Sequence, residues 1–402
     1  MSNLFKRRTV MGGAAGLAGA AASMFRATGA DAKLPMNDIE PRGQTGRLER
    51  LPTLDLEAND EFLTTMRIWV NSSLNRAAEE RARELMAAHS VDKKLDMPLE
   101  DAFKQTYMDD PVVQMRSHVW LHAQNLMWHN LKREFHSNYD AYMAEMEAAD
   151  KAGPGKLEFN PGIEPAYTKH EIHIQPGGYV GDPFAGHLYH YGTNNFYSGR
   201  NYQDDLHVAM AANVPTPKNG KVFRILDQGC SCGQLTVALK QRFPEAEVWG
   251  IDVGGPMVRY SHMRAVDMGV DVNFRQALAE DSKFPDGHFD IVTSYILHHE
   301  VPADITRKIT RESNRVLRTG GVYYPIDFRT GTSGRSVQRE MNPYDKVRNW
   351  ASHRWNHERW LYEYNSTSHA EEMRLAGFEV DENGPASGFG GRGANVMGTK
   401  SA

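Results

Sequence analysis

An acidic residue and a tight run of small residues stand together near the middle of the 402-residue chain. Asp227 ends an apolar stretch, and the small residues from Gly229 to Gly233 follow it, directly before a helical pattern. A turn of small residues lets a ligand come close to the backbone. Dinucleotide-binding folds hold a pyrophosphate at such a turn, but their GxGxxG spacing is absent here. The pattern therefore predicts a ligand site without predicting a dinucleotide.

A second acid, Asp252, follows Trp249-Gly250-Ile251 at the end of the next apolar run. A carboxylate at the end of this strand can accept hydrogen bonds from both hydroxyls of a ribose. The spacing of the two acids suits a nucleoside ligand.

Two histidines follow a later apolar run, in the segment from Tyr295 to Glu300. A neutral imidazole at His298 or His299 could take a proton from a hydroxyl or thiol, because its reference pKa near 6.5 suits work at neutral pH. In the alternative interpretation, one histidine caps the next helix and the other packs in the core. A thiolate or thioether acceptor would need no base at all, since transfer to it depends mainly on alignment.

Another group of histidines recurs between residues 112 and 149 at helical spacing. Metal ligands on a helix favour an i, i+4 pair with a third donor nearby, and only the first two have that spacing. We assign no metal to this group and interpret it as a polar or substrate-facing wall. Its members are His118, His122, His129 and His136.

From Lys221 onward, short β-branched runs alternate with helical patterns, which is typical of a parallel sheet with crossover helices. Strands are expected at 222–227, 247–252, 272–276, 289–294, 321–326 and 378–380, and helices near 233–242, 255–268, 305–317 and 370–376. The candidate acids and histidines then stand at strand ends.

The rest of the chain divides by composition. Residues 33–54 are predicted to be a linker and 55–150 an all-helical domain. Residues 151–220 form a connector whose length favours a functional role, and 221–402 contain the sheet. An insertion at 329–366 is crowded with Trp and Tyr. It is either an aromatic cover for a substrate or packing against the helical domain.

Four motifs, in order within Lys221–Asp327, resemble those of class I S-adenosylmethionine-dependent methyltransferases, with the histidines typical of the ubiquinone/menaquinone-biosynthesis-like branch. They are the turn at 227–233, the strand ending at Asp252, the segment 277–290, and the turn 316–321 before the fifth strand. The resemblance implies an α/β fold, with a doubly wound, Rossmann-like sheet of seven strands beside the N-terminal helical domain. It also implies S-adenosyl-L-methionine as cofactor. A Rossmann-like domain with another nucleotide, or with none, is the alternative.

The same resemblance implies the residues that contact the cofactor. They are Asp227, Gly229, Cys230, Gly233, Asp252, Val253, Leu278, Ala279, Glu280 and Ser294. The family usually has an acidic residue where this chain has Leu278. The contact to the adenine amino group is therefore left open, to Glu280 or to a backbone carbonyl.

In that branch a histidine just after the fourth strand lies near the point of methyl transfer, and in many members the segment before the first strand covers the cofactor as a lid. The resemblance thus implies catalytic and substrate-binding candidates. The catalytic candidates are His298, His299 and Tyr295, and the substrate candidates are His190, Tyr191 and Asn195, with Tyr189 beside them.

Composition and missing motifs narrow the acceptor. A formal net charge of -5 provides no basic field for nucleic acid, and the Asn-Pro-Pro-Tyr type signature of enzymes that methylate exocyclic amines is absent. We expect methyl transfer to an O, S, N or C atom of a small molecule. The alternatives are a non-catalytic protein that binds the cofactor or a metabolite, and a relative that transfers another group.

The first 32 residues have the layout of a twin-arginine export signal. Arg7-Arg8 is followed by a weakly apolar run from Gly12 to Ser23 and by Ala30-Asp31-Ala32. The run is short and rich in glycine, so no membrane span is expected after cleavage. The signal predicts a periplasmic protein. A disordered basic leader on a cytoplasmic protein is the alternative, and the helical domain offers a surface for a homodimer.

Overall fold

The computed structural model describes residues 46–48, 51–88, 98–328, 343–388 and 394–401, all within one compact unit, Glu40–Ala402. The predicted export signal and most of the predicted linker lie outside the described residues. Within the described ranges, no helix is both long enough and apolar enough to cross a membrane.

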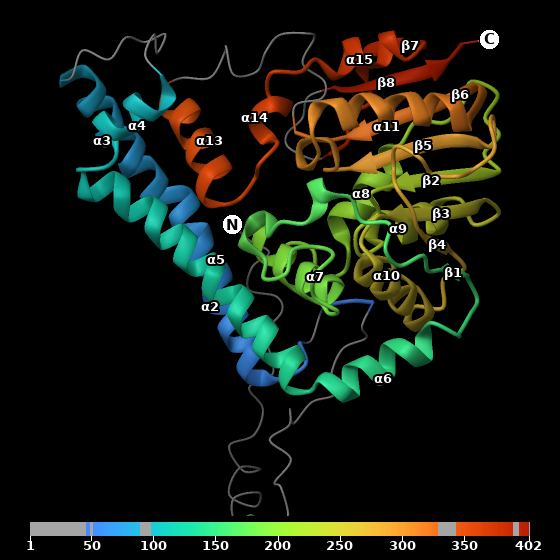
Figure 1. Ribbon diagram of the computed structural model, residues 1–402, viewed down its shortest axis with the longest axis horizontal. Coiled ribbons are helices and arrows are strands. Elements are labelled where there is room, and N and C mark those ends of the chain that lie inside the picture. The colour runs from blue at the N-terminus through green and yellow to red at the C-terminus, as the bar shows by residue number, and fades with distance from the viewer. Residues whose placement is uncertain (1–45, 49–50, 89–97, 329–342, 389–393, 402) are drawn as a thin grey trace, which may run out of the picture. The chain divides into compact units, whose positions relative to one another are not determined.

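The centre of the fold is a mixed sheet in the order β1-β4-β3-β2-β5-β6-β8-β7 (Figure 1). Five parallel pairings run from β1 to β6, and β8 pairs antiparallel with both β6 and β7. The strands are β1 (Leu157–Glu158), β2 (Arg224–Gln228), β3 (Glu247–Asp252), β4 (Asn273–Gln276), β5 (Phe289–Tyr295), β6 (Leu317–Ile326), β7 (Phe378–Gly384) and β8 (Asn395–Lys400).

The described sheet has eight strands, so the expected count of seven is wrong by one. The additional strand is β1, a two-residue piece of the predicted connector that pairs with β4 at the sheet edge. It was missed because two residues carry no periodic signal. The other seven strands include the six that were placed in the sequence, and β8 is the one among them that was not placed.

Helices cover both faces of the sheet. Neighbouring residues of a strand point to opposite faces. Ile225 accordingly joins a core with α8 (Asp205–Asn213), α9 (Gln234–Arg242) and α10 (Gly255–Asp267). Leu226 joins a second core with the end of α11 (Ala303–Val316) and with α15 (His369–Leu375). The sheet is thus doubly wound, as predicted.

The strand order reverses at β2, which pairs with β3 on one side and β5 on the other. From β2 the chain continues outward to β3 and β4, and then returns to β5. In open α/β sheets, ligands bind outside the carboxyl ends of the strands at this reversal. Asp227, Asp252 and Tyr295 all stand at that edge.

The helices predicted between residues 55 and 150 are present. They are α2 (Leu54–Trp69), a π-helical turn η1 (Val70–Leu74), α3 (Asn75–Ala88), α4 (Leu99–Thr106), α5 (Pro111–Ser137) and α6 (Tyr139–Ala149). The Asp110 side chain caps α5 by accepting hydrogen bonds from the first free N–H groups. Because one compact unit holds these helices and the sheet, a separate helical domain remains a prediction.

The end of the predicted linker is part of the core rather than an extended spacer. Leu48 and Leu51 are buried in a cluster with Leu63, Trp128 and Phe184. The polar and proline-rich composition around these two leucines concealed their contribution.

Two helices lie in the predicted connector, where little periodicity was found: α7 (Ala185–Phe196) and α8. Every residue from Ala185 to Asn195 is buried, because α7 lies between α5 and α10 (Figure 1). The polar residues of α7 are buried together with its apolar ones, so no exposed polar face marks this helix in the sequence. The connector is therefore partly helical.

The aromatic insertion forms α13 (Pro343–Trp355) and α14 (Leu361–Tyr364) in its described part, while 329–342 lie outside it. The rings of Trp350 and Trp355 lie 4.6 and 5.0 Å from the ring of Phe103 on α4. Packing against the N-terminal helices is therefore confirmed. Helix α13 also lines the outer pocket described below.

We predict that Gly192→Ala destabilises the protein, although alanine is normally the better helix former. A Cβ at Gly192 would lie 2.2 Å from Cζ3 of Trp128. Overpacking of this kind costs about 1–3 kcal/mol, which exceeds the gain in helix propensity of about 1 kcal/mol. Chemical denaturation should show a lower free energy of unfolding.

Trp128→Phe provides the control, because it removes the ring atoms that the new methyl group meets. In the double variant the two losses should be less than additive. Full additivity would contradict the contact between α7 and α5.

Candidate active site

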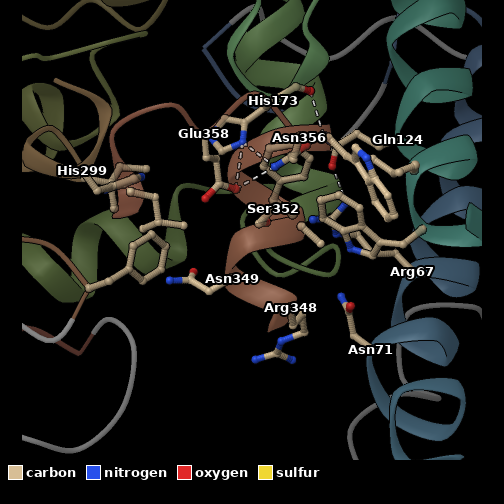
Figure 2. Close-up of a pocket in the computed structure, with 18 of the residues that line it drawn as sticks. Arg67, Asn71, Gln124, His173, His299, Arg348, Asn349, Ser352, Asn356 and Glu358 are labelled. Atoms are coloured by element: carbon tan, nitrogen blue, oxygen red, sulfur yellow. Dashed lines mark hydrogen bonds and ion pairs between the residues drawn. The ribbon is translucent and has the colours of Figure 1, made fainter. Parts of the chain in front are cut away.

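Two adjoining pockets open at the reversal point of the sheet. The inner pocket has a volume of about 80 Å³ and is bounded by the turn after β2, the ends of β3, β4 and β5, and the segment 167–179. The outer pocket has a volume of about 500 Å³ and lies between the sheet edge and α2, α5, α7 and α13 (Figure 2). Tyr189, Tyr295 and Ile296 line both pockets.

The turn after β2 brings backbone to the inner pocket. Gly229 has φ +65°, and a Cβ there would lie 2.8 Å from Leu297 Cδ1, so only glycine fits without strain. Asp227 is fully buried behind this turn. Its Oδ2 accepts a hydrogen bond from Thr236 at 2.7 Å, while Oδ1 has no partner. Burial raises the pKa of Asp227 to about 7, and the unpartnered oxygen is fit to receive a donor from a ligand.

Asp252 occupies the predicted place at the end of β3 and lines the inner pocket. Its carboxylate accepts hydrogen bonds from the backbone N–H of Ser231 at 3.0 Å and of Gly254 at 2.8 Å. These bonds fix its orientation, and each oxygen keeps a lone pair for a ribose hydroxyl. Burial nevertheless raises the pKa of Asp252 to about 6.

The other predicted cofactor residues divide into two groups. Val253, Ala279 and Glu280 line the inner pocket, and Cys230 lines a cavity of about 20 Å³ beside Asp227. Three do not line these spaces: Gly233 precedes α9 with φ +73°, Ser294 is buried in β5, and Leu278 lies in the turn after β4.

A cover lies over the inner pocket, but it comes from an earlier part of the connector than predicted. The pocket is lined by the short turns η2 (Ala166–Thr168) and η3 (Ile172–Ile174) and by the residues between them, through Tyr167, Thr168, His170 and Ile172. The Tyr167 hydroxyl donates a hydrogen bond to Glu280 at 2.5 Å. Ligand pockets usually measure about 300–1,000 Å³, so this cover must shift to admit a nucleoside.

The short turn η4 (His298–Glu300) after β5 presents one histidine to the outer pocket. Nδ1 of His299 lies 2.7 Å from Asp327 Oδ1, and because an ionised carboxylate only accepts, Nδ1 is the donor. Nε2 then carries the lone pair. Burial alone would lower the pKa of His299, but the charge and hydrogen bond of Asp327 raise it above its ordinary value.

His298 is turned away from both pockets, so its assignment as a catalytic residue is corrected. Its Nε2 lies 2.9 Å from the Tyr323 hydroxyl, and its ring centroid lies 4.3 Å from that of His369. The ring is thus part of the core behind the strand ends. Tyr295, by contrast, lines both pockets and donates its hydroxyl hydrogen to Tyr197 at 3.2 Å.

The three predicted substrate residues on α7 also face elsewhere. His190 lies 2.7 Å from the Tyr260 hydroxyl on α10, Tyr191 packs on Phe135 of α5, and Asn195 donates to Thr64 of α2. The prediction assumed a loop, in which all three side chains could face the substrate. In a helix, residues at these positions point in different directions, so each contacts a different neighbouring helix. The pocket side consists of Tyr189, Thr193, Phe196 and Tyr197.

Within the described ranges, one group places three possible metal-ligand atoms within 4.8 Å of one another: His173, His299 and Glu300. Nε2 of His173 lies 3.2 Å from Glu300, and its Nδ1 lies 3.4 Å from Glu358. Burial lowers the pKa of His173, but these two carboxylates raise it overall, to about 9. A protonated imidazole has no lone pair for a metal, so we interpret the group as a network of ion pairs. The histidines of α5 are not part of it.

The network also contains residues that the sequence analysis missed. Gln124 of α5 donates hydrogen bonds to the His173 carbonyl at 2.7 Å and to the Asn356 side chain. Figure 2 shows Asn356 and Glu358 beside His173, with Gln124 and Arg67 on the far wall from His299. No local motif marks these residues. For the α7 side of the pocket one signal existed: Tyr189, Thr193 and Tyr197 recur every four residues, which places them on one side of a helix.

The fold and site define a class. A doubly wound sheet with an acid at the end of β3 in a pocket at the reversal point, and a buried acid at the end of β2 behind the glycine turn, has the arrangement expected of a nucleoside-binding α/β domain. Residues 225–321 match the family model described as "Methyltransferase domain". The chain therefore carries a class I S-adenosylmethionine-dependent methyltransferase domain.

Relatives with curated descriptions match the same part of the chain. The demethylmenaquinone methyltransferase of Thermus thermophilus is 39% identical over 105 residues, which are 26% of this chain and 47% of that protein. The ubiquinone biosynthesis O-methyltransferase of Aeromonas salmonicida is 35% identical over 112 residues, 26% of this chain and 44% of that protein. The chain thus spans less than half the length of these relatives.

Solved structures align with a larger share of this chain, at lower sequence identity. An S-adenosylmethionine-dependent methyltransferase from Corynebacterium glutamicum is 16% identical, with a TM-score of 0.35, over 55% of this chain and 100% of that one.

We predict that Asp252→Ala weakens binding of S-adenosylmethionine about 10- to 100-fold, because a hydrogen bond to a charged group contributes about 1.5–3 kcal/mol. Calorimetric titration measures the change. In the unaltered protein the affinity should also fall below about pH 6, where Asp252 takes up a proton and can no longer accept both hydroxyls.

Asp271→Ala, at an exposed position before β4, is the matched control and should bind as the unaltered protein does. A folded Asp252→Ala protein, checked by thermal melting, with unchanged affinity would remove Asp252 from the cofactor site.

Proposed function

We propose that the protein transfers a methyl group from S-adenosylmethionine to a small-molecule acceptor held in the outer pocket. The observation that carries the proposal is the wall shared by the two pockets. Tyr295 and Tyr189 line both of them, and His299 stands on the outer side of this wall. A cofactor at Asp252 and an acceptor beside His299 would meet there.

The inner pocket would hold the cofactor through the ribose contact of Asp252 and the turn at Gly229. The unpartnered oxygen of Asp227 would receive a donor from the small cavity behind this turn. When bound, the cofactor supplies an electrophilic methyl group on a sulfonium. Glu280 is the side chain available for the adenine amino group in place of Leu278, since it lines the pocket and Leu278 does not. The cover formed by the segment 167–179 would exclude water from the inner pocket.

His299 would act as the general base for a hydroxyl or thiol acceptor. Its Nε2 takes the acceptor's proton, and the acceptor atom forms the new bond to carbon as the carbon–sulfur bond breaks. Asp327 stabilises the imidazolium that results. The products are the methylated acceptor, S-adenosylhomocysteine and a proton that His299 releases to solvent.

The acceptor would be a small molecule with apolar surface. Aromatic side chains of α5, α7 and α13 line the outer pocket, and its volume of about 500 Å³ is in the usual range for small ligands. Most residues of its walls lie outside the matched segment 225–321. The choice of acceptor would therefore depend on the helices outside that segment.

Incubating purified protein with methyl-labelled cofactor and a metabolite extract tests the proposal. We expect label in one or a few small products. Tight cofactor binding without any transfer would overturn the enzyme and favour a non-catalytic binding protein. Transfer of another part of the cofactor would favour a relative of the methyltransferases that transfers a different group.

We further propose export by the twin-arginine route, on the strength of the leader at residues 1–32. This route carries folded proteins, so cofactor could travel bound, although repeated turnover outside the cytoplasm would require a supply. Fractionation of cells that express a tagged chain tests it, and recovery of the uncleaved chain in the cytoplasm alone would contradict it.

A homodimer through the N-terminal helices is the last proposal in this group. Large apolar side chains are exposed on α2 and α5: Phe62, Ile68, Trp69, Met115 and Leu126. Such exposure in a soluble chain is typical of an interaction surface. Light scattering tests it, and a monomer at micromolar concentration would contradict it.

We predict that His299→Ala lowers kcat about 10²- to 10⁴-fold for a hydroxyl acceptor, the usual contribution of a general base. Cofactor affinity should not change. In the unaltered protein the rate should rise with pH through a pKa above 6.5, because the base must be neutral. Asp327→Asn should move that limb to lower pH, since it removes the charge that raises the pKa of His299.

His129→Ala, exposed on α5, is the control and should retain the full rate. A pH profile that is the same in the unaltered and Asp327→Asn proteins would contradict the role of His299 as base.

A further inference from the structure

Two arginines stand on the wall of the outer pocket opposite His299. Arg67 belongs to α2 and Arg116 to α5, and both line the pocket. Figure 2 shows the Arg67 side of the pocket across from His299. Neither residue belongs to the methyltransferase match at 225–321, and the proposed reaction gives them no role.

The guanidinium of Arg67 lies between aromatic rings. Its carbon is 4.3 Å from the centroid of Phe196 and 4.9 Å from that of Trp120. Its Nη1 donates to the side-chain oxygen of Gln124 at 3.1 Å. Gln124 is held in that orientation because its amide nitrogen donates to the His173 carbonyl. The stacked, planar group is therefore fixed in position.

Arg116 is held in the same way by a neutral partner. Its Nη2 donates to Asn71 at 3.4 Å, and its guanidinium lies 5.9 Å from the Trp120 ring. Asn71 belongs to the π-helical turn η1, between α2 and α3. Turns of this kind are frequent at functional sites, and this one contributes Asn71 to the pocket wall.

Within the described ranges, no carboxylate forms an ion pair with either guanidinium, and the attraction of Glu358 for Arg67 is weaker than the repulsion from Arg116. Both Nε atoms are buried and have no hydrogen-bond partner, whereas Arg348 nearby pairs with Asp345 at 3.0 Å. Burial lowers the pKa of Arg67 to about 9, with repulsion from Arg116 as the next cause. Two like charges that share one partly buried pocket are unfavourable unless an anion accompanies them.

We infer that Arg67 and Arg116 form the anion-binding end of the outer pocket, and that the acceptor carries a carboxylate or phosphate on an aromatic or other apolar body. The statement about the acceptor rests on the function proposed above. A guanidinium matches both anions with paired N–H groups, and the rings of Trp120 and Phe196 provide the apolar surface beside it. The reactive atom would then lie at the other end, near His299.

Binding of simple probes without cofactor tests the site. Benzoate, phenyl phosphate and benzyl alcohol share a ring but differ in charge, and each is titrated at constant ionic strength by calorimetry. We expect at least one anion to bind about tenfold or more tightly than benzyl alcohol. The stronger of the two anions distinguishes a carboxylate site from a phosphate site.

Arg67→Gln and Arg116→Gln should each weaken binding of that anion about 10- to 100-fold and leave benzyl alcohol unaffected. Arg76→Gln, at an exposed position on α3, is the control and should change neither. Removing an unbalanced charge should leave the melting temperature of the ligand-free protein unchanged or raise it.

Equal binding of the anions and benzyl alcohol, or unchanged anion affinity in the double variant, would overturn the inference. A lower melting temperature with unchanged selectivity would also overturn it, because the arginines would then be structural. The binding assay contains no cofactor and therefore tests this site alone. If the anions bind but the labelling experiment with cofactor shows no methyl transfer, the result counts against the proposed function and not against this site.

Discussion

The hydrogen bonds accepted by the Asp327 carboxylate, directly after β6, hold the wall of the outer pocket around His299 in place. This carboxylate accepts hydrogen bonds from the backbone N–H groups of His298, His299 and Phe328, and from Nδ1 of His299. A buried carboxylate must be satisfied by donors, and here a single group ties the turn after β5 to the end of β6. It thereby decides which of two neighbouring histidines faces the pocket and which nitrogen of that histidine is free.

The second constraint is the packing of α7, which links the N-terminal helices to the sheet. Its glycines allow close approach on two sides, since Gly192 lies against Trp128 of α5 and Gly186 against Tyr260 of α10. Its third side, with Tyr189 and Tyr197, lines the outer pocket. One buried helix therefore sets both the distance between the two parts of the fold and the shape of the space between them.

The two pockets are built largely from different parts of the chain. The inner pocket is built mainly from the strand ends and turns of the part that matches a methyltransferase domain, with the segment 167–179 as its cover, and three carboxylates line it: Asp252, Glu280 and Glu300. The outer pocket is built from α2, α5, α7 and α13, which contribute aromatic rings, amides and guanidiniums. The N-terminal helices thus have a role beyond packing, because they supply the wall opposite His299.

The sequence by itself determined the strands from β2 to β6, the acids at their ends and the glycine turn, because each depends on a local pattern of burial and backbone conformation. It did not determine β1, which is too short for a pattern, or α7, whose polar residues are buried together with its apolar ones. It could not separate His298 from His299, since both follow the same strand. Only the tertiary structure decided this, and it alone brought Arg67, Arg116, His173 and His299 to one pocket, because contacts between distant segments leave no periodic trace in the chain.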